Sequence, residues 1–254
     1  MTERIILQTE HLRRTFGGLV AVDDVSLQVR RGTLHSIIGP NGAGKTTLFN
    51  LMSGVLPPTS GRILFEGRDI TNVPAHGIAH LGIGRSFQIT NIFPSLTVLE
   101  NVRLAAQAVG KHNFTFWRDY RAFPEYIERA WEVLAMVGLQ KRAHLPAGTL
   151  AHGDKRKLEL AMILAPNPRL LLLDEPTAGM ASEQVPELMA LIERIRAVGD
   201  KTIVLVEHNM HVVMAASDVI TVMVQGRVLA EGAPAEIRAD ERVQRAYLGQ
   251  LYEE

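Results

Sequence analysis

The sequence predicts an α/β fold in which a mixed sheet core carries an N-terminal antiparallel β part and a helical lobe. Three observations support this fold class. Apolar and polar residues alternate over residues 25–30, which is typical of a half-buried strand. Residues 170–173 and 203–206 are almost wholly apolar, as in parallel strands that helices cover on both faces. Residues 95–165, between these regions, have helical features instead.

The N-terminal strands are predicted from alternation and turn residues. Val25, Leu27 and Val29 alternate with polar residues, and Arg31-Gly32 leads into a second apolar run that ends at residues 37–38. Residues 63–65 form another short apolar run, with a glycine on each side. We expect these segments to build the antiparallel part.

The helical lobe has start and stop signals of its own. Thr97 and Glu100 have the spacing of a capping box. Pro124 is placed to open a helix that carries Ile127, Trp131 and Leu134, and Gly138 is a natural end for it. The aromatic segment 109–123 lacks helical periodicity, so it is an irregular connector or a short exposed helix. Its aromatic residues serve either local packing or contact with another molecule.

The rest of the chain completes one domain over residues 1–254, because 254 residues suit one domain with an appended lobe. Residues 219–224 and 228–231 predict a hairpin around Gln225-Gly226-Arg227, followed by short polar helices. We expect the following division: sheet core and antiparallel part at 1–92 and 166–232, helical lobe at about 93–165, and helical tail at 233–254.

Composition narrows the function. The 27 basic and 27 acidic residues cancel, so nothing attracts the whole molecule to nucleic acid, and we expect no nucleic-acid partner. The absence of cysteine excludes disulfides, thiolate metal sites and cysteine nucleophiles. The apolar runs are far shorter than the ~20 residues that cross a bilayer. The first ten residues lack a secretory core, and we therefore expect a cytoplasmic chain that does not span a membrane.

A phosphate-binding loop is the strongest motif. Residues 39–46, Gly-Pro-Asn-Gly-Ala-Gly-Lys-Thr, fit the pattern GxxxxGK[ST] between an apolar run and a helical stretch. Backbone N–H groups of such a loop surround phosphates, Lys45 reaches the outer phosphates, and Thr46 binds Mg²⁺. The alternative is a glycine-rich turn before an ordinary helix. The predicted nucleotide-binding residues are Gly39, Asn41, Gly42, Ala43, Gly44, Lys45, Thr46 and Thr47.

A pair of carboxylates follows the apolar run at 170–173. Asp174 and Glu175 emerge at the carboxyl end of this predicted strand, which is where α/β sheets bind ligands. Asp174 is placed to reach Mg²⁺, and Glu175 is free to polarise the attacking water. Without the phosphate loop upstream, the same pair could be a solvated turn.

At this point the chain resembles the ATP-binding cassette (ABC) ATPases, P-loop NTPases of ABC type, over residues 5 to 249. The motifs that carry the resemblance follow in order: the phosphate loop (Walker A), Gln88 in Arg85-Ser-Phe-Gln88, Leu150-Ala-His-Gly-Asp154, Asp174-Glu175-Pro-Thr, and Glu207-His208. The resemblance implies a head-to-tail dimer with ATP bound between the phosphate loop of one subunit and the signature segment, residues 150–154, of the other.

The resemblance also implies individual roles. Phe16 stacks on adenine, Gln88 contacts the Mg²⁺ shell and links the site to the lobe, and His208 contacts the γ-phosphate. Ala151 and Gly153 belong to the signature segment that binds the partner's ATP. His211, three residues after His208, is read as a helix-face histidine.

This sequence departs from the family pattern at two places. Ala151 stands where a serine is usual and Asp154 where a glutamine is usual, so we hypothesise that the signature binds ATP less tightly than a serine version. Residues 155–157, Lys-Arg-Lys, could offset the charge of Asp154. Residues 176–182 lack the aspartate that is common in the loop facing the partner subunit.

Within the family, residues 85–102, 175–180, 206–210 and 246–249 resemble the ATP-binding subunits of branched-chain amino-acid uptake systems, and segment 110–123 resembles the longer of the two paired subunits. This implies a bacterial importer with a second cassette, identical or different, two integral-membrane permease subunits and an extracytoplasmic solute-binding protein. The chain would lie peripherally at the cytoplasmic side of the inner membrane.

Other functions stay open at this stage. Cassettes for urea or amide import and for lipopolysaccharide export are similar. A soluble ABC ATPase acting on DNA or ribosomes is disfavoured by the single phosphate loop and the lack of a basic stripe. A small-molecule kinase would leave Gln88, Glu175 and His208 without a role.

Overall fold

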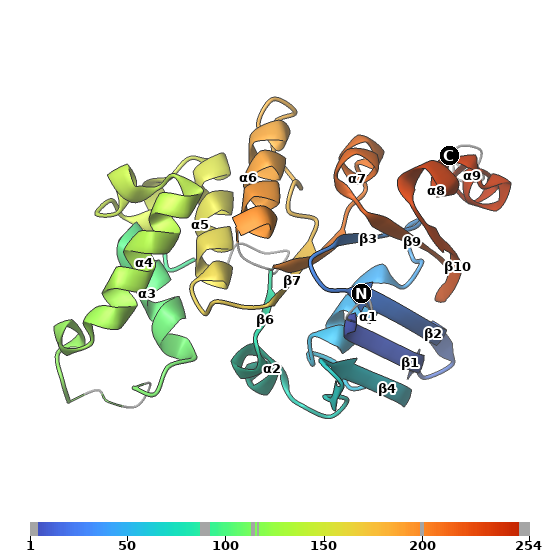
Figure 1. The fold of residues 1–254 in the computed structure, drawn as a ribbon, viewed down its shortest axis with the longest axis horizontal. Coiled ribbons are helices and arrows are strands. Elements are labelled where there is room, and N and C mark those ends of the chain that lie inside the picture. The colour runs from blue at the N-terminus through green and yellow to red at the C-terminus, as the bar shows by residue number, and fades with distance from the viewer. Residues whose placement is uncertain (1–4, 87–91, 113–114, 116, 199–200, 249–254) are drawn as a thin grey trace.

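The computed structural model describes residues 5–86, 92–112, 115, 117–198 and 201–248, and it confirms the predicted α/β fold. Figure 1 shows two sheets on one side of the molecule and a group of helices on the other. The antiparallel sheet has the order β2-β1-β4-β5 and the second sheet the order β10-β9-β3-β8-β7-β6. The strands are β1 (Ile5–Phe16), β2 (Leu19–Arg30), β3 (Leu34–Ile38), β4 (Ser60–Phe65), β5 (Arg68–Asp69), β6 (Ile83–Arg85), β7 (Leu170–Asp174), β8 (Thr202–Val206), β9 (Val219–Val224) and β10 (Arg227–Gly232).

The second sheet is parallel except at one edge. Strands β9, β3, β8, β7 and β6 pair in parallel, and β10 joins β9 as the antiparallel half of the predicted hairpin. All residues of β3, β7 and β8 are buried, which agrees with the nearly continuous apolar sequences of β7 and β8, whereas β3 also buries His35 and Ser36. The parallel arrangement brings the carboxyl ends of these strands to one edge.

One strand prediction needs correction, and one strand was not predicted. The run that ends at residues 37–38 does not belong to the antiparallel part, because β3 is a central strand of the parallel sheet, between β9 and β8. Strand β1 has no clear alternation in its sequence, yet it lies between β2 and β4. Register shifts interrupt its pairing, including one between Thr9 and Leu12 that contains His11 at φ 48°, so its apolar residues do not keep a period of two.

The helices cover the parallel sheet and form the lobe (Figure 1). Their bounds are α1 (Lys45–Met52), α2 (Ala75–Leu81), α3 (Val98–Ala108), α4 (Pro124–Val137), α5 (His152–Leu164), α6 (Val185–Val198), α7 (Met210–Ala216), α8 (Pro234–Ala239) and α9 (Glu241–Leu248), with short 3-10 turns at 120–122, 140–142 and 147–149. Among the helices that the structure describes, none combines the length and apolar character that crossing a bilayer requires.

Helix α3 forms only half of the predicted capping box. The Glu100 N–H donates to Thr97 Oγ1 at 3.1 Å, as an N-cap requires. The Glu100 carboxylate does not return to the Thr97 N–H but accepts from the Arg103 guanidinium, at 2.8 Å from Nε. Because Arg103, one turn further along the helix, binds the Glu100 carboxylate, the second hydrogen bond of the capping box does not form.

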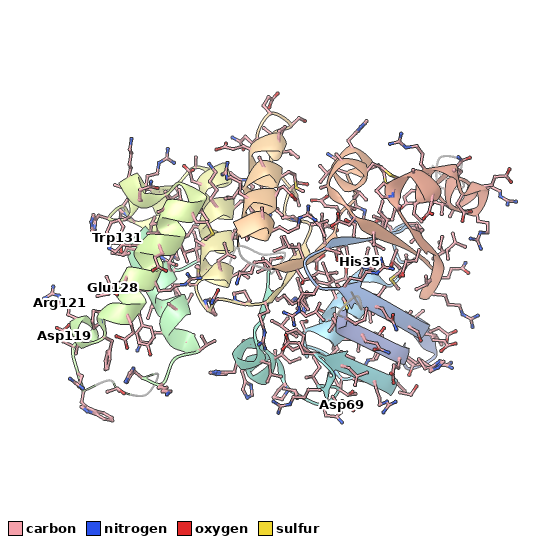
Figure 2. All side chains as sticks on the ribbon, in the orientation of Figure 1. His35, Asp69, Asp119, Arg121, Glu128 and Trp131 are labelled. Carbon is pink, nitrogen blue, oxygen red and sulfur yellow. The ribbon has the colours of Figure 1, made fainter. Side chains whose placement is uncertain are left out.

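Helix α4 begins at Pro124 and ends before Gly138, which adopts φ 77°, as predicted. Leu134, one of the three apolar residues expected on this helix, is buried, but Trp131 is not. Trp131 lies on the outer side of the helix and is 36% exposed (Figure 2), whereas Tyr126, Ala130 and Val133 are buried. The face of α4 that packs in the lobe is therefore not the face that carries the indole.

Candidate functional site

Three segments with polar residues meet where parallel strands end. The phosphate loop joins β3 to α1, Asp174 and Glu175 follow β7, and Glu207 and His208 follow β8. Because β3, β8 and β7 are neighbours in the sheet, their carboxyl ends place these segments side by side. The structure thus brings together residues that are up to 169 positions apart in the sequence.

The phosphate loop needs glycine at both of its ends. Gly39 has φ 154°, and a Cβ on it would lie 2.2 Å from the Met223 carbonyl oxygen. Gly44 has φ 95°, and a Cβ there would lie 2.3 Å from the Ala21 carbonyl oxygen. Both glycines thus combine an unusual backbone conformation with a close backbone approach. Gly44 caps α1 without a side chain, which leaves N–H groups at the start of this helix available to an anion.

A cleft of about 500 Å³ lies beside this loop. Its lining residues come from the phosphate loop and α1, from the start of β2, and from the ends of β7, β8 and β9. They are Leu19, Val20, Ala21, Asn41, Gly42, Ala43, Gly44, Lys45, Thr46, Thr47, Glu175, His208 and Gln225.

Lys45 is the buried cation of the cleft. Its Nζ donates to the carbonyl oxygens of Gly39 at 2.7 Å and Pro40 at 3.0 Å. Burial lowers the Lys45 pKa, and the charges of Glu175 and Asp174 act in the opposite direction. An ammonium that has lost much of its hydration and holds only neutral carbonyls gains by meeting an anion.

Asp174 is almost completely buried, at 3% exposure. Its N–H donates to Ser86 Oγ at 2.8 Å, but its Oδ1 has no hydrogen-bond partner among the residues that the structure describes. Burial raises the Asp174 pKa, while the nearby charge of Arg85 lowers it. A buried carboxylate oxygen without a donor is the type of atom that a cation satisfies.

Glu175 and His208 face the cleft as a hydrogen-bonded pair. The Nε2–H of His208 donates to Glu175 Oε1 over 2.7 Å. Glu175 is held at φ 47°, a region that non-glycine residues rarely adopt. The Glu175 N–H donates to the Val206 carbonyl at 2.9 Å, so the neighbouring strand helps to hold this conformation.

Glu207 links two segments of the site, a role that the sequence interpretation did not assign when it named Glu207-His208 as a motif. It is 4% exposed and accepts from both Thr177 Oγ1 at 2.6 Å and the Thr177 N–H at 3.1 Å. It also accepts from the His208 N–H at 3.1 Å. It therefore joins the segment after Glu175 to the segment that carries His208. A carboxylate directly after a fully apolar strand was the available signal.

The signature segment lies elsewhere. Ala151 is the N-cap of α5 without a side-chain hydrogen bond, and Gly153 lies against the side chain of Gln184. Although α5 is fully described, none of its residues lines the phosphate-loop cleft. One chain thus holds the two predicted halves of a nucleotide site in separate places.

The charge of Asp154 is compensated in the structure. Its carboxylate pairs with the guanidinium of Arg142, which ends the 3-10 turn at 140–142, and its Oδ1 is 3.9 Å from Lys157 Nζ. Asp154 does not cap α5. Of the three basic residues considered as an offset, Lys157 takes part, and Arg142 is an additional partner that the sequence interpretation did not include.

The roles predicted for two further residues, Phe16 and Gln88, are not tested by the geometry of the cleft. Phe16 ends β1 opposite Leu19, a cleft-lining residue; it is 41% exposed, with the Arg14 guanidinium 4.7 Å from its ring centre. Adenine stacking by Phe16 stays a prediction. Gln88 lies outside the described residues.

An apolar cavity of about 270 Å³ separates the sheet core from the lobe. Helix α2 and strand β6 form one wall, and α3 and α5 form the other, with Ala79, Ala105 and Ile163 among the lining residues. Arg85 at its floor donates to Asn50 Oδ1 at 2.6 Å and acts on the charge of Asp174. We call this cavity the interlobe groove.

Comparison with known proteins places these features. Residues 22–178 match the family model for ABC transporters, and residues 227–251 match the model for the branched-chain amino acid ATP-binding cassette transporter. The high-affinity branched-chain amino acid transport ATP-binding protein BraF of Pseudomonas aeruginosa is 42% identical, covering 97% of this chain and 99% of BraF. The corresponding LivG of Escherichia coli is 40% identical, with 96% and 98% covered.

Solved structures agree with the sequence relatives. An ATP-binding cassette of an ABC transporter in its ADP conformation has 32% identity and a TM-score of 0.85, covering 96% of this chain and 99% of its own. A dimeric cassette in a post-hydrolysis state with ADP and Pi has 26% identity and a TM-score of 0.76, covering 90% of this chain and 99% of its own.

Proposed function

Because this chain belongs to the ABC transporter family as an ATP-binding cassette, we propose that it is the ATP-hydrolysing subunit of an importer for branched-chain amino acids. The observation that carries the substrate class is the identity of about 40% to BraF and LivG over nearly the whole of each chain. The C-terminal match to the branched-chain amino acid model supports the same class independently of the motifs around the phosphate loop.

Mg²⁺ fits the residues at the cleft. Asp174 offers a buried carboxylate oxygen that lacks a partner among the described residues, and Thr46 offers a hydroxyl at the start of α1. Hard oxygen donors of this kind suit Mg²⁺. We propose that Thr46 and Asp174 hold the ion, with Gln88 as the third contact. When bound, Mg²⁺ neutralises charge on the phosphate oxygens.

The chemistry then follows from the protein side chains. Lys45 exchanges the carbonyl oxygens of Gly39 and Pro40 for phosphate oxygens, which relieves a desolvated ammonium. Glu175 accepts the proton of the attacking water, and His208 holds the Glu175 carboxylate in position. His208 is also available to contact the terminal phosphate.

A second cassette completes the site. Ala151 and Gly153 lie at an uncapped helix start outside the cleft of their own chain, and uncapped N–H groups bind anions. In a head-to-tail dimer, they would face the nucleotide on the partner. The dimeric relative supports this assembly, with an identical or a different second cassette.

The interlobe groove is the proposed docking site for a permease. Its lining is mostly apolar, with Glu159 of α5 among the exceptions, and Arg85, which also lines it, acts electrostatically on Asp174. A permease helix seated there would contact both parts of the cassette at once. The chain would thus lie peripherally at the cytoplasmic side of the inner membrane, and the solute-binding protein would act on it only through the permease.

Reconstitution tests the proposal. The chain should be purified with its permease subunits and second cassette, placed in lipid nanodiscs, and assayed for ATP hydrolysis with the solute-binding protein. We expect leucine, isoleucine or valine to stimulate hydrolysis, whereas urea or acetamide should not. Stimulation by urea alone would reassign the substrate, and failure to purify with any permease would remove the transport role.

A further inference from the structure

Arg156 of α5 reaches the loop that follows the carboxylate pair. Its Nη2 donates to the Ala178 carbonyl oxygen at 3.1 Å, 22 positions further along the chain. Its Nη1 donates to Glu159 Oε2 at 2.9 Å, one turn further along α5. The side chains of Arg156 and Glu159 are only 12% and 14% exposed, so this ion pair is largely protected from solvent. Arg156 thus joins two segments of the chain through a sheltered cation.

Ala178 closes the turn that begins at Glu175. The Ala178 N–H donates to the Glu175 carbonyl oxygen at 3.0 Å. Glu175 itself is held at φ 47°, a conformation that persists only where the surrounding contacts enforce it. The hydrogen bond from the Glu175 N–H to Val206 holds one end of this turn, at 2.9 Å. The guanidinium of Arg156 holds the other end.

Other close contacts join the same two segments. A Cβ on Gly179 would lie 3.7 Å from His152 Cε1, and a Cβ on Gly153 would lie 3.2 Å from Gln184 Oε1. His152 and Gly153 belong to the first turn of α5, whereas Gly179 and Gln184 lead into α6. Figure 1 shows α5 and α6 side by side, and Lys157 of α5 donates to Glu187 of α6 at 2.6 Å. The start of α5 therefore packs on the chain that carries the turn.

Glu159 gives the Arg156 side chain its direction. A free arginine has many rotamers, and a carboxylate that accepts from Nη1 leaves Nη2 aimed at the backbone. Both side chains also line a small cavity of about 20 Å³ together with Asp174. Glu159 lines the interlobe groove as well. The ion pair thus lies between the groove and the carboxyl end of β7.

We propose that Arg156 is a positioning residue for ATP hydrolysis: its guanidinium holds the Ala178 carbonyl, and through this turn it sets the Glu175 carboxylate for the attacking water. Glu159 keeps the guanidinium in place. This inference rests on the proposed role of Glu175 as the base. A partner bound in the interlobe groove would contact Glu159, the residue that orients Arg156.

A purely structural Arg156, which only fastened the lobe to the sheet core, would behave differently. Its loss would lower the stability of the chain and would weaken nucleotide binding and hydrolysis together. Loss of a positioning residue for Glu175 lowers kcat and leaves KM nearly unchanged, because the base acts in the chemical step and not in the binding of ATP. The two roles are therefore separated by kinetics.

Arg156→Gln tests the inference, with Arg129→Gln as the matched control. Arg129 of α4 also pairs with a carboxylate three residues on, that of Glu132 at 3.1 Å, and donates to the backbone, to the Leu164 carbonyl at 2.9 Å. In the assembled transporter, we expect Arg156→Gln to lower kcat about ten- to hundredfold while KM for ATP stays within twofold. Arg129→Gln should keep the wild-type kcat.

Two further variants show whether Arg156 acts through Glu175. Arg156→Lys keeps the charge but not the planar fork, so kcat should recover in part. Adding Arg156→Gln to Glu175→Gln should not lower the residual turnover further, because the carboxylate that Arg156 positions is already absent. Steady-state hydrolysis in nanodiscs measures the single variants, and single-turnover hydrolysis measures the double variant.

Three outcomes would overturn the inference: normal kcat in Arg156→Gln, an equal loss of kcat in Arg129→Gln, or full additivity with Glu175→Gln. Should Arg156→Gln fail to fold, a normal kcat in Arg156→Lys would overturn it instead. Failure of the proposed function is distinguishable, because Glu175→Gln alone would then keep normal turnover, and the inference would fall with its premise.

Discussion

At the residue scale, buried polar groups are the most constrained parts of the molecule. His35, in the central strand β3, is 1% exposed and lies in the interior (Figure 2). Thr221 Oγ1 donates to Glu231 Oε2 at 2.8 Å, so its lone pairs accept from His35 Nε2 at 2.7 Å. A hydroxyl has only one hydrogen, and the proton of His35 is therefore on Nε2. The imidazole is a neutral structural element.

Stability should depend on pH through His35. Burial, and to a lesser extent the charge of Arg30, lowers its pKa from 6.5 to about 4. Below pH 6.5 the unfolded chain takes up a proton that the folded chain refuses, so stability falls as the pH drops from 6.5 to 4. The loss reaches about 3 kcal/mol, from 1.36 kcal/mol per pKa unit. Denaturant unfolding at pH 4 to 7.5 should show this slope, and His35→Gln should lack it. An unchanged slope in the variant would contradict the assignment.

Glu175 carries a second prediction at this scale. Glu175→Gln keeps an oxygen that accepts from His208 but removes the base. We expect ATP turnover to fall about 10²- to 10⁴-fold with ATP affinity retained, which would trap a closed dimer. Hydrolysis assays and gel filtration with ATP measure both effects. Lys45→Ala is the contrasting variant, because it should lose productive binding itself. Normal turnover by Glu175→Gln would exclude the base role.

At the scale of elements, the charges around the N-terminus of α5 determine how strongly this helix can attract an anion. Its N-cap, Ala151, provides no hydroxyl, and the Arg142 ion pair neutralises Asp154 one turn into the helix. The positive end of the helix is therefore not cancelled by its own carboxylate.

This balance can be tested with two substitutions. Ala151→Ser adds a hydroxyl, so it should lower the KM for ATP in the assembled transporter. Arg142→Ala exposes the charge of Asp154 at the helix start and should raise KM about two- to fivefold. Steady-state hydrolysis in nanodiscs measures both values. Unchanged KM in both variants would show that the start of α5 does not meet nucleotide.

At the scale of the whole molecule, the interlobe groove is the place where one bound partner would contact both the sheet core and the lobe. Helix α2 lies on its core side, and α3 and α5 lie on its lobe side. A carboxylate added to the wall that α2 forms should prevent a permease helix from seating.

Ala79→Glu places such a charge, with the exposed neighbour His80→Glu as the matched control. We expect Ala79→Glu to lose copurification with the permease while its Kd for ADP stays within twofold of wild type. His80→Glu should keep both properties. Normal copurification of Ala79→Glu would move the docking site away from the groove.

The motifs with local causes were predictable. The phosphate loop was predictable because its glycines, Lys45 and Thr46 lie within one short stretch of sequence. The start and end of α4 were predictable because Pro124 and Gly138 each determine the backbone conformation within one turn of the helix. Strand β1 was not found, since bulges interrupt its alternation. The exposure of Trp131 was also missed, because the indole is apolar although it lies off the stripe formed by Tyr126, Ala130 and Val133.

The fold class, the family and the residue types that a nucleotide site needs could all be predicted from the sequence, because periodic patterns and the order of motifs are properties of the linear chain. Which of these groups meet depends on the three-dimensional fold. The contacts of Arg142 with Asp154 and of Glu207 with Thr177 join segments that are separate in the sequence. Their existence depends on strand order and helix docking, and a linear pattern of residue types contains neither.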